Sequence, residues 1–126
     1  HNLYNFKKKF ESKKVFRIYI PNIYNESENR IEFGFTEGTS TDNAGNEISG
    51  YFGYSVPLTS NRTREDVITQ IIRHVYTRGS EDSLKTEAII SLSKGDKVSD
   101  DFSDFAEWRS MAKDAESQLE HRNING

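Results

Sequence analysis

The chain has 126 residues, a formal net charge of −3 and no cysteine, which excludes disulfides, thiolate catalysis and cysteine-based metal sites. No apolar run approaches the roughly 20 residues of a membrane span, and no signal-peptide core is present. A hydrophobic content of 33% with 12% aromatic residues predicts a single α+β domain over residues 1–126, with a small core rich in aromatic side chains.

The first 13 residues are basic and carry one narrow apolar stripe. Leu3, Phe6 and Phe10 follow helical spacing, so we predict that residues 1–13 form an arm or short helix that packs on the domain. The lysines outside this stripe are Lys7, Lys8, Lys9 and Lys13. They suggest an alternative function, nucleic-acid binding by lysines interleaved with aromatic rings. The net negative charge of the chain argues against it, because nucleic-acid-binding domains are usually basic.

Three consecutive segments have the composition of antiparallel strands. Residues 14–20 are β-branched and aromatic, and a polar loop follows at 23–29. Residues 30–38 alternate between apolar and polar side chains, and a return strand is expected over 47–57. The turn between them is DNAGN at 42–46, because Asn and Gly tolerate positive φ. The sequence therefore predicts a three-stranded meander.

Three glycines interrupt the predicted strands: Gly34, Gly50 and Gly53. Glycine inside a strand indicates a bulge, a bend or a close approach of another group. We interpret these glycines as curving the sheet so that a helix can pack across it. The alternative is a shallow ligand or peptide groove over bare backbone.

A helix and a fourth strand are expected after the meander. Thr63 is a suitable N-cap for a helix over 64–77, and Gly79 is its expected stop. A polar loop at 80–84 then leads to residues 86–93, whose apolar side chains predict a largely buried strand.

The last helix is predicted over residues 101–120, with a frayed tail at 121–126. Its apolar residues follow strict 3–4 spacing and are Phe105, Trp108, Ala112, Ala115 and Leu119. This stripe fits packing on the sheet, or alternatively the seam of a homodimer. The predicted element order is α-β-β-β-α-β-α, a mainly antiparallel four-stranded sheet with one strand added after a helix crossover and covered by two or three helices.

No motif that carries known chemistry is present. The phosphate-binding, dinucleotide-binding, nucleophile-elbow and zinc-protease patterns are all missing from the sequence. The histidines, His1, His74 and His121, are not at metal-ligand spacing. Acids near 96–104 are better explained by helix capping than by a cation site. We therefore expect no enzymatic activity, no metal and no cofactor.

These observations favour a binding module that engages a protein partner or a second copy of itself, as a dimer. The predicted contact residues are Tyr24, Tyr51, Tyr54 and Asn43, since tyrosine is enriched in interfaces. A composition rich in Asn, Lys, Ile and Ser fits an AT-rich genome and a small bacterial, phage or mobile-element accessory protein. We expect it in the cytoplasm, and a secreted mature form fits the same sequence.

A small anionic ligand, a nucleotide or a metabolite, is the alternative partner. Its predicted site is formed by Arg73, His74 and Arg78 beside the glycine-bearing strands. A third hypothesis is an enzyme in which His74 acts with a remote carboxylate.

Overall fold

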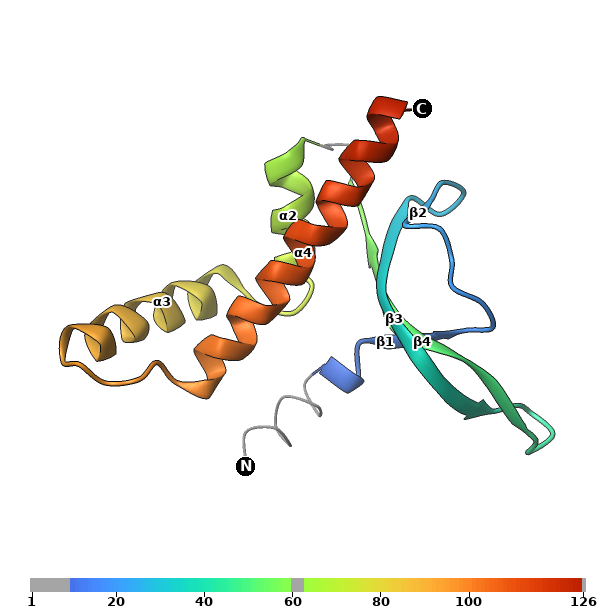
Figure 1. The fold of residues 1–126 in the computed structure, drawn as a ribbon, viewed down its shortest axis with the longest axis horizontal. Coiled ribbons are helices and arrows are strands. Elements are labelled where there is room, and N and C mark those ends of the chain that lie inside the picture. The colour runs from blue at the N-terminus through green and yellow to red at the C-terminus, as the bar shows by residue number, and fades with distance from the viewer. Residues whose placement is uncertain (1–9, 60–62, 126) are drawn as a thin grey trace.

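The computed structural model describes residues 10–59 and 63–125, and the side chains up to residue 119. The described chain is an α+β fold, as predicted, in which a helical turn at residues 10–11 leads into a curled antiparallel sheet and three helices follow the sheet (Figure 1). The N-terminal arm predicted over residues 1–13 falls mostly outside the described residues.

The sheet has four strands, and all neighbours are antiparallel. They are β1 (Lys14–Arg17), β2 (Tyr24–Asn25), β3 (Arg30–Thr41) and β4 (Glu47–Pro57), in the spatial order β1-β4-β3-β2. The first strand is shorter than predicted, and it pairs with β4 rather than with β3, so the predicted three-stranded meander is wrong. The fourth member of the sheet is the two-residue strand β2, which lies inside the segment predicted to be a polar loop.

The β3–β4 hairpin forms as the turn residues predict. Asp42 Oδ1 accepts hydrogen bonds from the main-chain N–H groups of Ala44 and Asn46, at 2.9 and 2.8 Å. A β-bulge interrupts the register just after Phe33, at Gly34, whose φ of 70° is readily adopted only by glycine. The expected role of glycine in curving the sheet is therefore confirmed at this position.

After the sheet, the described helices are α2 (Arg64–Arg73), α3 (Arg78–Ser93) and α4 (Asp100–Asn125). The side chain of Thr63 accepts a hydrogen bond from the N–H of Asp66 at 3.3 Å, so the predicted N-cap is confirmed. Gly79 is not the stop of this helix, because α2 ends at Arg73 and Thr77 caps the start of α3.

The predicted loop at 80–84 and strand at 86–93 are wrong, because both belong to α3. A short apolar run does not by itself distinguish a buried strand from a helix. The Thr77 cap starts a helix in which Glu81 and Ala88 are buried and Leu84 is partly buried, which is helical spacing. From Lys14 onward, the described elements are thus four strands followed by three helices rather than the predicted alternation.

The core lies between the sheet, α2 and α4, with Trp108 at its centre. The indole is 5.3 Å from the ring of Phe10, 5.6 Å from Phe33 and 4.9 Å from Tyr54. The whole predicted apolar stripe of α4, from Phe105 to Leu119, is buried. The helix continues to Asn125, so residues 121–125 of the tail predicted to fray at 121–126 are helical.

Candidate functional site

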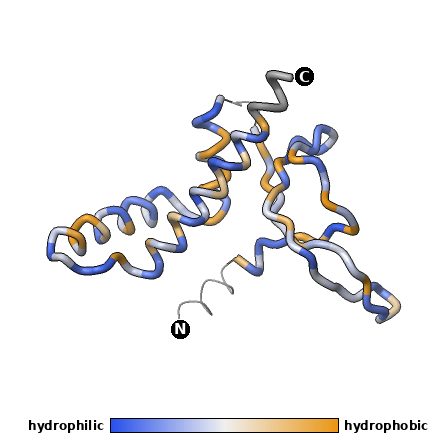
Figure 2. Tube along the Cα trace, viewed as in Figure 1, coloured by the Kyte–Doolittle hydropathy of each residue, from blue (hydrophilic) through white to orange (hydrophobic). Residues whose placement is uncertain are grey.

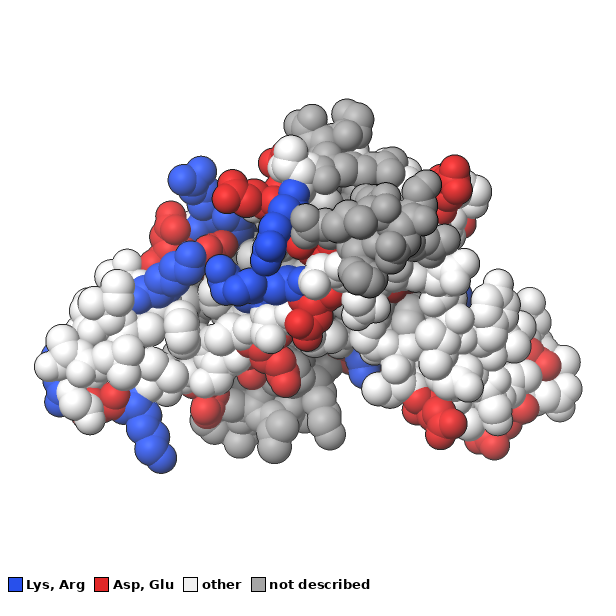
Figure 3. All heavy atoms as spheres, turned by 45° about the horizontal axis from the view of Figure 1, so that its top comes forward, with Lys and Arg blue, Asp and Glu red and all other residues white. Residues whose placement is uncertain are grey.

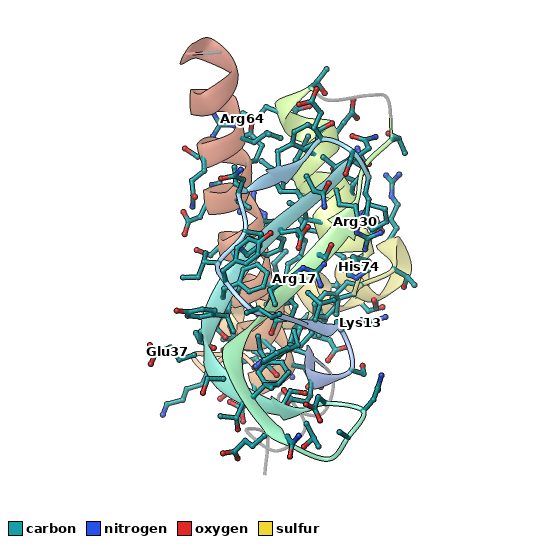
Figure 4. The ribbon with its side chains drawn as sticks, turned by 90° about the vertical axis from the view of Figure 1, so that its right-hand side faces the viewer. Lys13, Arg17, Arg30, Glu37, Arg64 and His74 are labelled. Atoms are coloured by element: carbon teal, nitrogen blue, oxygen red, sulfur yellow. The ribbon has the colours of Figure 1, made fainter. Side chains whose placement is uncertain are left out.

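His74, at the C-terminal end of α2, lies beside two cations from distant parts of the chain. Lys13 directly precedes β1 and Arg30 begins β3, and Figure 4 shows all three along one edge of the molecule. Burial lowers the pKa of His74 below its ordinary value of 6.5, and the positive charges of Lys13 and Arg30 lower it further. We call Lys13, Arg30 and His74 the basic cluster.

Core packing and strand pairing bring these residues together. The ring of Phe10 lies 6.2 Å from that of Tyr76, which places the segment before β1 beside the end of α2. Across the sheet, Arg30 donates from Nε to Ser55 Oγ at 2.6 Å and from Nη2 to Ser55 O at 3.0 Å. The guanidinium of Arg30 is therefore fixed over β4.

The described part of the chain supplies no counter-ion to the basic cluster. Among residues 10–59 and 63–119, no carboxylate oxygen lies within 4.0 Å of a cationic nitrogen of Lys13, Arg30 or His74. Glu32 is a buried acid on the same face of the sheet, and both of its carboxylate oxygens already accept hydrogen bonds from other residues. Arg17 Nε donates to its Oε1 at 2.9 Å, and Asn25 Nδ2 donates to its Oε2 at 3.1 Å.

The other two residues of the predicted ligand site have different surroundings. Arg73 Nη1 donates to Glu81 Oε1 at 2.8 Å, and Lys85 Nζ pairs with Glu81 Oε2 at 2.5 Å. Burial raises the pKa of Glu81, but the hydrogen bonds from Lys85 and Arg73 outweigh it and lower the pKa overall. Arg73 thus anchors α3 to α2. Arg78 is exposed at the first residue of α3.

Only two of the three residues of the basic cluster could be predicted as site residues from the sequence. His74 was predicted in a ligand site and Lys13 in a nucleic-acid site, but Arg30 was missed. No local pattern links these three positions, because the register of β3 on β4 is what brings Arg30 to Ser55. Lys7, Lys8 and Lys9 lie outside the described residues.

The predicted protein-contact residues fall in three kinds of environment. Asn43 is exposed at the tip of the β3–β4 hairpin, and Tyr24 and Tyr51 are half-buried. The hydroxyl of Tyr24 donates to Asn29 Oδ1 at 2.8 Å. Tyr54 is only 7% exposed and packs edge-on against Trp108. Tyr54 is therefore a core residue and not part of a contact surface, because it pairs across the sheet with Phe33 on the inner face.

A shallow hollow of about 480 Å³ lies on the β3–β4 hairpin. Tyr51 and Ile18 line it together with Glu37, Gly38, Thr39, Ser49 and Gly50. The sequence from Ile31 to Asn61 contains no Lys or Arg. On the face shown in Figure 3, Lys and Arg gather over the helices, and the hairpin end shows acidic and uncharged side chains. The hollow is therefore unsuited to an anion.

Two groups of large apolar side chains are exposed in the described chain. Ile18, Tyr19 and Ile20 follow β1 and are 74%, 72% and 60% exposed. Ile89, Ile90 and Leu92 lie in the last turns of α3 and are 68%, 48% and 63% exposed. Both groups were missed, because the sequence placed them in strands of the sheet.

Helix α3 projects away from the sheet, and its far end is hydrophobic (Figures 1 and 2). On a helix with about 100° per residue, Lys85, Ile89 and Leu92 lie on one stripe. Asp96 lies just beyond the end of α3, after Gly95, whose φ of 78° ends the helix. All four residues are exposed. We call Lys85, Ile89, Leu92 and Asp96 the α3 patch.

Within the described part of the chain, no group of three or more His, Asp or Glu side chains is arranged to hold a metal ion. None of the helices over the same residues combines the length and apolar character that crossing a membrane requires. Comparison with family models, with curated proteins and with solved structures finds no match to this chain.

Proposed function

We propose that this protein is a binding module without catalytic activity that associates with a second copy of itself through the α3 patch. The observation that carries the proposal is the exposure of Ile89 and Leu92, at 68% and 63%. They lie on a helix that buries Glu81 and Ala88, and partly Leu84, against its own chain. Exposed apolar groups rimmed by charge are typical of interaction surfaces.

The charges of the α3 patch favour a second copy as the occupant. The stripe is positive at Lys85, apolar at Ile89 and Leu92, and negative at Asp96. An antiparallel copy related by a two-fold axis would place Ile89 opposite Leu92 of the second copy. It would bring Lys85 near the C-terminal end of the second α3, where Asp96 lies. A two-fold interface has to be self-complementary in this way.

The small size of the α3 patch limits the expected affinity of the dimer. Stable interfaces bury about 1,200–2,000 Å² in total, and a single exposed helical stripe contributes less than this. We therefore expect a concentration-dependent dimer with a Kd of the order of 10 μM, which corresponds to about 7 kcal/mol.

Sedimentation equilibrium of the Ile89→Glu variant tests the apolar centre of the patch. We expect the variant to remain monomeric at concentrations where the wild type dimerises, because the dimer would bury two carboxylates without partners. Ile18→Glu is the matched control, since Ile18 is equally exposed but lies outside the patch. A wild type that stays monomeric at millimolar concentration contradicts the proposal, as does an equal loss in both variants.

A charge exchange tests the antiparallel arrangement. Asp96→Lys and Lys85→Glu each place like charges opposite one another, so each variant alone should dimerise less than the wild type. Mixing the two variants restores both opposite-charge pairs in the heterodimer. Failure of the mixture to associate more strongly than either variant alone, with both shown by circular dichroism to be folded, overturns the arrangement.

A further inference from the structure

We propose that the basic cluster of Lys13, Arg30 and His74 binds the phosphate group of a small molecule. The site is separate from the α3 patch and draws on three elements: the turn before β1, the start of β3 and the end of α2. The hydrogen bonds and charges around it indicate both an anionic ligand and a small one.

Arg30 is held ready to donate. Its Nε and Nη2 are bonded to Ser55, and no acceptor among the described residues takes the N–H groups of Nη1. A guanidinium fixed on one edge can present the other edge to two oxygens of one oxyanion. Ser55 itself is buried, so the orientation of Arg30 does not depend on the ligand.

Because no described acid pairs with the basic cluster, a bound anion would stabilise this site. Two permanent positive charges lie near a histidine whose protonation they oppose. In the described residues Glu32, the buried acid on this face, is committed to Arg17 and Asn25. A bound dianion attracts all three members of the cluster and favours the protonated form of His74, which then becomes a third donor.

The size of the cluster favours a small phosphate compound over nucleic acid. Duplex-binding proteins commonly neutralise about 6–10 phosphates, whereas this cluster offers two permanent cations. The chain carries a net charge of −3 and no Lys or Arg between Ile31 and Asn61. A long polyanion would meet this acidic hairpin, and a single phosphate group would not.

Isothermal titration calorimetry with inorganic phosphate and with adenosine monophosphate tests the proposal. We expect saturable binding with one site per chain, weakened about tenfold or more by Arg30→Gln and by Lys13→Gln. Arg78→Gln is the matched control, because it removes an exposed cation outside the cluster and should leave the affinity unchanged. The proposal is overturned if binding does not saturate at about 10 mM ligand, which is tenfold above a Kd of about 1 mM. An equal loss of affinity in Arg78→Gln overturns it as well.

The two probes distinguish the source of the phosphate group. Tighter binding of adenosine monophosphate identifies a phosphomonoester as the ligand, and equal affinities identify the free ion. A single-stranded oligonucleotide that binds far more tightly than either, with a steep salt dependence, overturns the small-molecule proposal in favour of nucleic acid. Ile89→Glu should bind phosphate as the wild type does, so failure of the dimer and failure of this site are distinguishable.

Histidine NMR supplies a readout at the site itself. Sulfate is a suitable probe because it stays dianionic throughout the titration range of histidine. Saturating sulfate should raise the pKa of His74 and leave the other two histidines, His1 and His121, unchanged. An unchanged pKa of His74 at saturation would show that the anion binds elsewhere.

Discussion

The indole Nε1 of Trp108 donates a hydrogen bond to the main-chain oxygen of Ile71 at 2.9 Å, joining residues separated by 37 positions. Through this bond α4 is fixed against α2 while the same indole contacts the rings of Phe33 and Tyr54 on the sheet. One side chain therefore connects both helices to the inner face of the sheet. Its loss should weaken the packing of α2, of α4 and of the sheet.

Trp108→Phe should lower the free energy of unfolding by about 2–3 kcal/mol, since it removes the hydrogen bond and part of the buried ring. Urea denaturation followed by far-UV circular dichroism measures this change. Tyr19→Phe is the control, because Tyr19 is 72% exposed and should tolerate the change. A loss below about 0.5 kcal/mol would show that the indole is not the centre of the core.

Gly53→Ala should destabilise the protein by about 1–3 kcal/mol through overpacking. A Cβ at Gly53 would lie 2.5 Å from the ring of Phe35, which crosses this glycine on the outer face of the sheet. Gly79→Ala is the opposite case. Apart from its chain neighbours and the backbone of α3, no described atom lies within 4 Å of a Cβ there, so alanine should stabilise the first turn of α3 by about 0.5–1 kcal/mol. Thermal melts of both variants test the contrast, and a stabilising Gly53→Ala would be inconsistent with this packing.

His74→Gln should reduce the dependence of stability on pH. The pKa of His74 is lowered in the folded state by burial and by the charges of Lys13 and Arg30, so the unfolded chain binds this proton more readily. The free energy of unfolding therefore falls as the pH drops through the unfolded value of about 6.5. Unfolding at pH 7.5 and pH 5, in buffers without phosphate or sulfate, should show the variant gaining relative to the wild type at the lower pH. A pH-independent difference would contradict this effect.

Glu81→Gln should destabilise the protein by about 1–2 kcal/mol at pH 7, because the hydrogen bonds from Arg73 and Lys85 lose their charged acceptor. The lowered pKa of Glu81 means that its contribution is present above the unfolded pKa and is lost as the pH falls through the folded value. The difference between variant and wild type should therefore shrink toward pH 3. Asp82→Asn, at the exposed neighbouring position, is the control and should change little. A difference that grows in acid would disprove this linkage.

The parts of the fold set by local signals could be predicted from the sequence. Three features can be recognised from a short stretch of sequence, and each is confirmed: the DNAGN turn, the Thr63 cap and the stripe from Phe105 to Leu119. The segment 86–93 could not be assigned in this way, because its apolar residues face solvent on α3. Exposure of an apolar run depends on what the rest of the chain covers, and sequence periodicity does not record it.

The candidate sites were harder to predict from the sequence for the same reason. The basic cluster depends on strand register and on the packing of Phe10 against Tyr76, so no spacing in the sequence joins its members. Tyr54 was misplaced because its aromatic character fits an interface and a core equally well, and only its pairing with Phe33 decides between them.

The projecting position of α3 divides the molecule into two levels of local stability. Among the described residues, α3 is joined to the rest of the chain by the ion pair of Glu81 with Arg73 and by its packing on α4, so we expect α3 to open while the core around Trp108 stays closed. Native-state amide exchange would then be fast in α3 and slow in β3, β4 and α4. If a second copy covers the α3 patch, mass action makes the exchange in α3 slower as protein concentration rises. The fraction of molecules in which α3 is folded would thus depend on the concentration of the protein itself.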